Sequence, residues 1–300
     1  MVSGRMLSVR FYREKMMSTL LRSVALILLT IVTLALSSCS GTIVTAMIEP
    51  ALENMQEQSD IELVCEGTPA YLLMIDSLIA GDQENIDLLT LGTKAYSGYI
   101  GAMGECELEA HRIAAMADKA YLYSQMLLQA ILDVTPNEDI GSFELHLGSA
   151  GKRDAEPLFW STFGWIIWIQ QQQGSPSAMA GLGKIEKLLL KIIELDETVQ
   201  SGSAHFLLGG YYGSRPAMFG GNPEKSRFHF DRALELSKRK ILIFQTVYAE
   251  TYCRAMLDKN CHDMLLNEVI SFPLEANQRN ILANTIAKKR AVRLLDEGFF

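Results

Sequence analysis

The sequence is poor in proline and in positive charge. Eight prolines among 300 residues, with a near-average 22 glycines, exclude a collagen-like or proline-rich disordered chain. Residues 1–38 hold five of the 27 basic residues and one of the 35 acids, so the remainder carries 22 basic and 34 acidic residues, a net charge of −12. A protein with this negative net charge is repelled by the phosphates of a nucleic acid, so we expect no nucleic-acid partner.

Motifs of enzymes and metal sites are also missing. The five histidines are scattered between residues 111 and 262 and show no metal-ligand spacing such as HExxH. Cys261 and His262 are neighbours, but adjacent residues on a helix point about 100° apart, which does not suit a histidine-activated thiolate. The sequence therefore predicts a protein that is not an enzyme and that has no metal or cofactor.

The first forty residues carry the strongest local signal. A basic segment precedes "VALILLTIVTLAL" at residues 24–36, which is too short to cross a bilayer comfortably but suits a secretory signal. Leu36-Ser37-Ser38-Cys39 then matches a bacterial lipobox, in which small residues precede the cysteine that takes the lipid. We expect a lipoprotein signal peptide at residues 1–38. An ordinary signal peptide is the alternative, and translation can begin at Met1, Met16 or Met17.

Lipidation would decide where the protein resides. Each buried methylene contributes about 0.8 kcal/mol, so the two or more acyl chains on Cys39, such as palmitate, would hold the protein at a bilayer without spanning it. Residues 39–42 would form the lipidated tether, and Ser40 after the cysteine favours the outer membrane over the inner one. We expect a body that faces the periplasm.

The remaining four cysteines lie in an oxidising compartment on this interpretation. Cys253 and Cys261 flank "RAMLDKN", a corner between helices, so a disulfide between them is geometrically feasible; free buried thiols are the alternative. With Cys65 and Cys106, three full pairings exist, and the sequence does not choose among them.

Helical periodicity dominates beyond residue 42. Apolar residues recur at i, i+3, i+4 and i+7, and no segment alternates with period two for long enough to require a strand. The clearest examples are residues 86–103, 105–132, 185–196 and 282–295. The breaks between helices are short, and no Pro/Ser-rich linker divides the chain. The sequence predicts one all-α domain at residues 43–300.

Residues 208–237 indicate a tetratricopeptide-like helix pair. Leu208, Gly209 and Tyr212 fit the first helix of such a repeat, while Phe230 and Ala233 fit the second. The two halves are about five residues further apart than a standard repeat allows. The surplus lies in "SRPAMFGG", so we expect degenerate repeats packed into one compact domain.

The glycine run in this segment could suggest a phosphate-binding loop. A Walker loop, however, needs Gly-Lys-Ser/Thr entering a helix, and a Rossmann loop needs GxGxxG after a strand. Here Gly220-Gly221 leads into Asn222-Pro223-Glu224, which is a helix cap, a first-turn proline and a first-turn acid. The pattern favours a structural corner between two helices.

Three segments resemble the T component of tripartite ATP-independent periplasmic (TRAP) transporters. They are "FWSTFGWIIWIQ" (159–170), residues 195–237 and residues 282–300. Cys253 and Cys261 depart from the pattern, since apolar residues are expected there. The most specific matches lie in the middle segment and are Gly202, His205, Pro216, Gly220, Gly221, Phe230 and Ala233.

The resemblance implies a lipoprotein built from degenerate tetratricopeptide-like helix pairs. It further implies a homotrimer that docks the periplasmic solute-binding subunit of the transporter, and a cavity or pore through each protomer into which ligand could pass. A generic envelope-assembly scaffold, with a concave surface that holds a peptide or protein, is the alternative function.

Several side chains are candidates for binding a ligand or partner. Trp160 and Trp168, with Trp165 nearby, could form an aromatic wall for an apolar ligand, and core packing is the alternative. His205, Tyr212 and Arg215 lie at or near the glycine corner, where a cation could bind a carboxylate. Helix capping by Arg215 and simple packing of His205 are the alternatives for those two residues.

Overall fold

The computed structural model describes residue 48 and residues 50–135, 138–172 and 174–300. The chain divides into two compact units, Met1–Met47 and Ile48–Phe300, and all described residues belong to the second. The expected signal peptide at 1–38, the tether at 39–42 and the lipid-attachment residue Cys39 lie outside the described residues. They stay predictions from the sequence.

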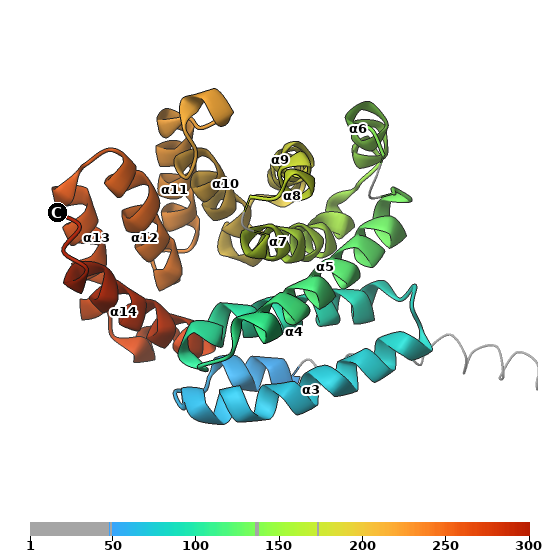
Figure 1. Ribbon diagram of the computed structural model, residues 1–300, viewed down its shortest axis with the longest axis horizontal. Coiled ribbons are helices and arrows are strands. Elements are labelled where there is room, and N and C mark those ends of the chain that lie inside the picture. Colours follow the sequence, from blue (N-terminus) through green and yellow to red (C-terminus); the bar gives the residue numbers. More distant parts are fainter. Residues whose placement is uncertain (1–47, 49, 136–137, 173) are drawn as a thin grey trace, which may run out of the picture. The chain divides into compact units, whose positions relative to one another are not determined.

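Helices make up the described part of this unit, which contains no strand, so the predicted all-α class is confirmed. After a short helix at residues 50–56, the first half consists of α3 (Ile61–Gly81), α4 (Ile86–Ala102), α5 (Ala110–Leu132), α6 (Ile140–Gly148), α7 (Ala155–Gln171), α8 (Pro176–Ala180) and α9 (Leu182–Asp196). The second half consists of α10 (Ser203–Gly213), α11 (Pro223–Leu236), α12 (Leu242–Tyr248), α13 (Lys259–Ser271) and α14 (Ile281–Asp296). Neighbouring helices lie side by side along much of the chain (Figure 1).

Local sequence explains where several helices begin. The Asn222 side chain accepts a hydrogen bond from the backbone N–H of Lys225 at 3.0 Å, and Pro223 occupies the first turn of α11. This is the helix start predicted for the glycine corner. Asp60 and Asp258 cap α3 and α13 in the same way.

Among the described helices, α3 alone has the length and apolar composition of a membrane span. One face of α3 nevertheless packs into the unit, with Tyr71, Leu72, Ile75 and Ile79 buried. Asp76 on this helix accepts hydrogen bonds from the hydroxyls of Tyr96 and Tyr123, from α4 and α5. These contacts are those of a helix at the edge of a packed array.

Two large hydrophobic clusters of described residues contribute to the core, beside buried apolar side chains of α3, α4 and α5. The first is centred on α7, α9 and α10, and the second on α11–α14. Helix α7 approaches α4 and α5 so closely that a Cβ on Gly164 would lie 2.7 Å from Thr93 Cγ2 and 3.0 Å from the Ala120 oxygen. A larger residue there would force these helices apart.

The two ends of the array meet. Ile61 and Val64 of α3 pack against Leu282 at the start of α14 in a small separate cluster. Figure 1 shows α14, in red, returning to the end of the array where α3 and α4 lie. The array therefore closes on itself, and elements from both halves can enclose a common space.

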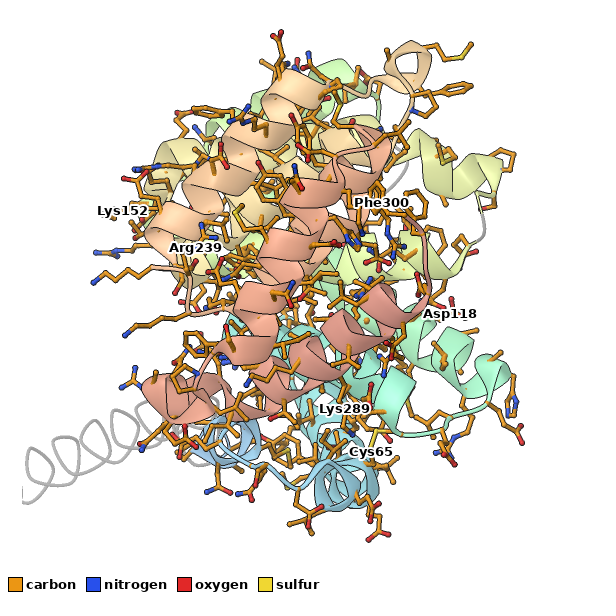
Figure 2. The ribbon with its side chains drawn as sticks, turned by 90° about the vertical axis from the view of Figure 1, so that its left-hand side faces the viewer. Cys65, Asp118, Lys152, Arg239, Lys289 and Phe300 are labelled. Atoms are coloured by element: carbon orange, nitrogen blue, oxygen red, sulfur yellow. A yellow bond between two sulfur atoms is a disulfide. The ribbon has the colours of Figure 1, made fainter. Side chains whose placement is uncertain are left out.

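The described residues form two disulfides. Cys65–Cys106 joins α3 to the segment after α4, and Cys253–Cys261 joins a π-helical turn at Ala249–Cys253 to the first turn of α13. This is one of the three pairings that the sequence left open. Cys65 and Lys289 of α14 are labelled at the same end of the unit in Figure 2.

Candidate functional site

A cavity of about 480 Å³ lies where the two halves of the array face each other. Side chains from α3, α4, α7, α10, α12 and the start of α14 line it, together with residues 52–57. Cavities of roughly 300–1,000 Å³ are typical of sites for small organic ligands. The volume is thus large enough for such a molecule.

One wall of the cavity is aromatic. Phe159 and Phe163 of α7 stack with their ring centroids 5.9 Å apart, and Trp160 meets both rings edge-on at 5.2 and 6.0 Å. All three line the cavity, as do Phe206 and Phe244, which stack at 4.5 Å. Aromatic rings give a large apolar contact area at fixed geometry. The wall suits an apolar part of a ligand.

Charged and polar side chains also line the cavity, beside further apolar ones such as Leu52, Leu207 and Ile243. The ammonium of Lys94 lies 5.7 Å from the centroid of the Trp160 ring, within cation–π range. Arg279 contributes a second cation, and Glu53 and Glu57 contribute acids. The cavity therefore combines an apolar wall with groups that can orient a polar end of a ligand.

Trp160 is the one sequence-predicted binding candidate that lines the cavity. Its indole nitrogen is buried and has no hydrogen-bond partner among the described residues. Buried polar atoms are nearly always paired in folded proteins. Trp160 is therefore the side chain of the aromatic wall with an unused donor.

Trp168 lies elsewhere. Its indole N–H donates to Asp118 at 3.0 Å, and its ring stacks on Tyr121 with centroids 4.2 Å apart. Figure 2 labels Asp118, on α5. Trp165 is buried in the first core cluster, so the three tryptophans do not form one surface.

His205 is buried against His229. Their Nδ1 atoms lie 2.9 Å apart, so one ring donates and the other accepts. Glu197 is 3.4 Å from Nε2 of His205, within ion-pair distance but without a hydrogen bond. Burial lowers the pKa of both rings, and nearby His205 and Lys225 help to lower that of His229 to about 4. The pair joins α10 to α11 in its neutral form and does not line the cavity.

Tyr212 and Arg215 follow at the end of α10, where the Tyr212 ring stacks on His229 with centroids 5.8 Å apart. The hydroxyl of Tyr212 donates to Glu186 at 2.5 Å. The guanidinium of Arg215 lies 3.4 Å from the Tyr211 ring centroid, and its Nε donates to the Tyr211 carbonyl oxygen at 2.9 Å. These contacts fix the end of α10. Whether Trp168, His205, Tyr212 and Arg215 contact a partner stays a prediction.

The glycine corner has a constrained backbone. Gly220 in the corner has a φ of +85°, as does Gly202 at the beginning of α10, and this conformation favours glycine. A Cβ on Gly221 would lie 1.7 Å from the Arg215 carbonyl oxygen, and Pro216 has a φ of −60°. Phe230 and Ala233 of α11 are fully buried. The corner is thus a fixed turn between α10 and α11.

Sequence reasoning missed much of the cavity. Phe206, Phe244, Lys94 and Arg279 come from segments far apart in the chain, and no spacing pattern connects them. The nearest signal was the position of Phe206, directly after His205 in the segment that resembles the T component. No described group of three or more His, Cys, Asp or Glu side chains could hold a metal ion.

Comparisons with known proteins give one family. The sequence model of the family described as TRAP transporter T-component matches residues 57–298, which is most of the chain. A comparison with curated proteins gave no match. The matched residues include α3 to α14, and with them nearly all of the cavity wall. The chain therefore belongs to the TRAP transporter T-component family.

Proposed function

We propose that this accessory transporter component is a lipid-anchored periplasmic protein that docks the solute-binding subunit of its transporter and holds or relays an organic ligand. The observation that carries the proposal is the 480 Å³ cavity with its aromatic wall, in a chain of this family. The lipobox ending at Cys39 supports the anchor, with the outer membrane as the preferred location.

The chemistry of the cavity supports an organic ligand with an apolar body. Phe159, Trp160 and Phe163 offer ring faces and edges, while Lys94 and Arg279 could each meet a carboxylate. The acidic side chains of Glu53 and Glu57 also line the cavity, so a ligand with several negative charges is disfavoured. A molecule with one polar end and an apolar remainder fits best.

A tetratricopeptide-like origin of the fold belongs to the same proposal. A Cβ on Gly209 would lie 2.7 Å from the Phe230 ring, so the aromatic of α11 fills the space left by the small residue of α10. Such a small-residue and aromatic pair is the packing expected within one repeat. It supports degenerate helix-pair repeats for the α10–α11 segment.

Sedimentation velocity tests the docking. The full-length protein, held in detergent, would be mixed with the solute-binding subunit of its own transporter, and in a parallel sample with one from an unrelated transporter class. We expect a homotrimer that gains up to one cognate partner per protomer and none of the unrelated protein. If the protein stays free of the cognate subunit at micromolar concentration, the generic envelope scaffold becomes the better account.

A further inference from the structure

Helix α3 has an uncharged and largely apolar exposed face. Leu73 is 67% exposed and Met74 is 43% exposed. Successive residues of a helix are 100° apart, so the exposed residues of this face lie within an arc of about 140°. Between residues 67 and 80 the exposed residues are Gly67, Ala70, Leu73, Met74, Ser77 and Ala80.

Other helices at the surface of the unit show the usual pattern. Charged side chains normally cover the solvent-facing side of such a helix. The exposed residues of α11 include Glu224, Lys225, Arg227, Asp231 and Glu235. Exposed apolar faces with a polar border are typical of interaction surfaces. The face of α3 therefore suits an apolar partner.

The chain that precedes α3 suggests what this partner is. The Tyr71 hydroxyl of α3 donates to the Ile48 carbonyl oxygen at 2.7 Å, which fixes Ile48 beside the helix. Ile48 follows Cys39, the expected lipid-attachment residue, by nine residues. Because a fully extended chain spans at most about 3.5 Å per residue, Cys39 is within about 32 Å of Ile48. A lipid on Cys39 would thus keep α3 near the bilayer.

We propose that the exposed face of α3 between residues 67 and 80 lies on the surface of the bilayer. The inference rests on the lipid anchor of the proposed function. In an anchored chain the contact is intramolecular, so a face too small to bind vesicles from solution can still lie on the membrane. The exposed acids Glu66 and Asp82 border the face, so it enters the interface and not the hydrocarbon core.

A second copy of the chain is the competing occupant of this face. Gly67, Ala70 and Ser77 are small, and small residues let two helices approach closely. The anchor favours the bilayer, because it acts on each single chain at any protein concentration. The two occupants differ in what surrounds a label on the face, which is lipid in one case and protein in the other.

A fluorescent label on α3 tests the proposal with the full-length lipoprotein in phosphatidylcholine vesicles. Met74→Cys provides a thiol for the environment-sensitive dye NBD, since the four cysteines of the described part form disulfides. Met179→Cys is the matched control, because Met179 is also 43% exposed. It lies on α8, and the successive neighbours α4, α5, α7 and α9 separate α8 from α3 (Figure 1). Lipids with a nitroxide on the acyl chain quench NBD that touches the bilayer.

We expect nitroxide lipids to quench the label on Met74→Cys at least twofold more than the label on Met179→Cys. Equal quenching at the two sites would overturn the proposal. An NBD emission typical of apolar surroundings at Met74→Cys without quenching would also overturn it, because protein would then cover the face. Flotation of the vesicles distinguishes these results from failure of the anchor. Protein that does not float with the vesicles would exclude the anchor, and the bilayer contact with it.

A charge on the same face gives a second test. Leu73→Glu places a carboxylate beside the Met74→Cys label, and Leu190→Glu places one at a 41% exposed position of α9. Quenching at the Met74→Cys label should fall at least twofold in Leu73→Glu and stay the same in Leu190→Glu. Circular dichroism should show the same helix content in both, because both leucines are exposed. Unchanged quenching in Leu73→Glu would contradict a face that lies on lipid.

Discussion

The carboxylate of Glu105 accepts a hydrogen bond from Arg293 at 2.7 Å, although 188 residues separate the two in the chain. The ammonium of Lys289 lies 3.2 Å from the same carboxylate. Glu105 is 9% exposed, whereas both cations are about half exposed. Together with the packing of Val64 against Leu282, these ion pairs join the two ends of the helix array. They thereby help to enclose the cavity.

Glu105→Gln should weaken that closure. Burial alone would raise the pKa of Glu105, but the hydrogen bonds from Arg293 and Lys289 outweigh it, and the net pKa lies below its usual value. The stabilisation is therefore present above the unfolded-state pKa and is lost as pH falls through the folded-state pKa. We expect urea unfolding at pH 7 to show that Glu105→Gln lowers the free energy of unfolding by about 1–2 kcal/mol. Glu84→Gln, at an exposed turn, should change stability by less than about 0.5 kcal/mol.

The His205–His229 pair predicts acid sensitivity. The pKa of His229 falls to about 4 in the folded chain, against about 6.5 when unfolded. A depressed histidine pKa stabilises the fold fully above pH 6.5, and the contribution is lost as pH falls towards 4. Between pH 7.5 and 4.5 this one group should account for about 2 kcal/mol of lost stability.

A comparison of variants isolates that contribution from the titrating carboxylates. His229→Gln retains a side-chain donor for His205 but does not titrate. Urea unfolding across this pH range should show about 2 kcal/mol less pH dependence in His229→Gln than in the parent chain. His111→Gln, at an exposed position, should match the parent. Parallel curves for parent and His229→Gln would mean that the buried pair does not govern acid stability.

Replacement by alanine at two glycines near each other in sequence should have opposite effects on the stability of the fold. Gly221→Ala places a Cβ 1.7 Å from the Arg215 carbonyl oxygen, so the corner must rebuild, with a loss of about 2 kcal/mol or more. A Cβ on Gly210, inside α10, meets no atom within 4 Å. Gly210→Ala should be neutral or stabilising by up to about 1 kcal/mol, because alanine favours the helix. Thermal unfolding of both variants distinguishes them.

The two disulfides should differ in the stability they confer. Cys65–Cys106 spans 41 residues and Cys253–Cys261 spans 8. On the chain-entropy model the longer loop contributes about 4 kcal/mol and the shorter about 2.5 kcal/mol. Paired Cys→Ser variants, compared by urea unfolding, should therefore show the larger loss for Cys65 and Cys106. A larger loss for the short loop would contradict this ranking.

Local patterns predicted local structure well. Helical periodicity indicated the all-α class, and Asn222-Pro223-Glu224 indicated the start of α11, because both depend on residues close in sequence. The cavity depends instead on which helices meet. Trp160 was identified as a candidate, but Phe206 and Phe244 reach it from other helices after the array closes. Trp168, the other tryptophan candidate, donates instead to Asp118 of the neighbouring α5 and does not line the cavity.

The central claim is that the cavity binds an organic ligand with an apolar body. Fluorescence titration with N-phenyl-1-naphthylamine, on residues 48–300 so that detergent does not take up the probe, tests it most directly. Gly98→Phe fills the cavity at a helical position with free space, and Gly183→Phe makes the same change on the exposed face of α9. We predict saturable binding of one probe per chain in the parent and in Gly183→Phe, and at least tenfold weaker binding in Gly98→Phe. Equal binding by all three proteins would contradict a ligand site in this cavity.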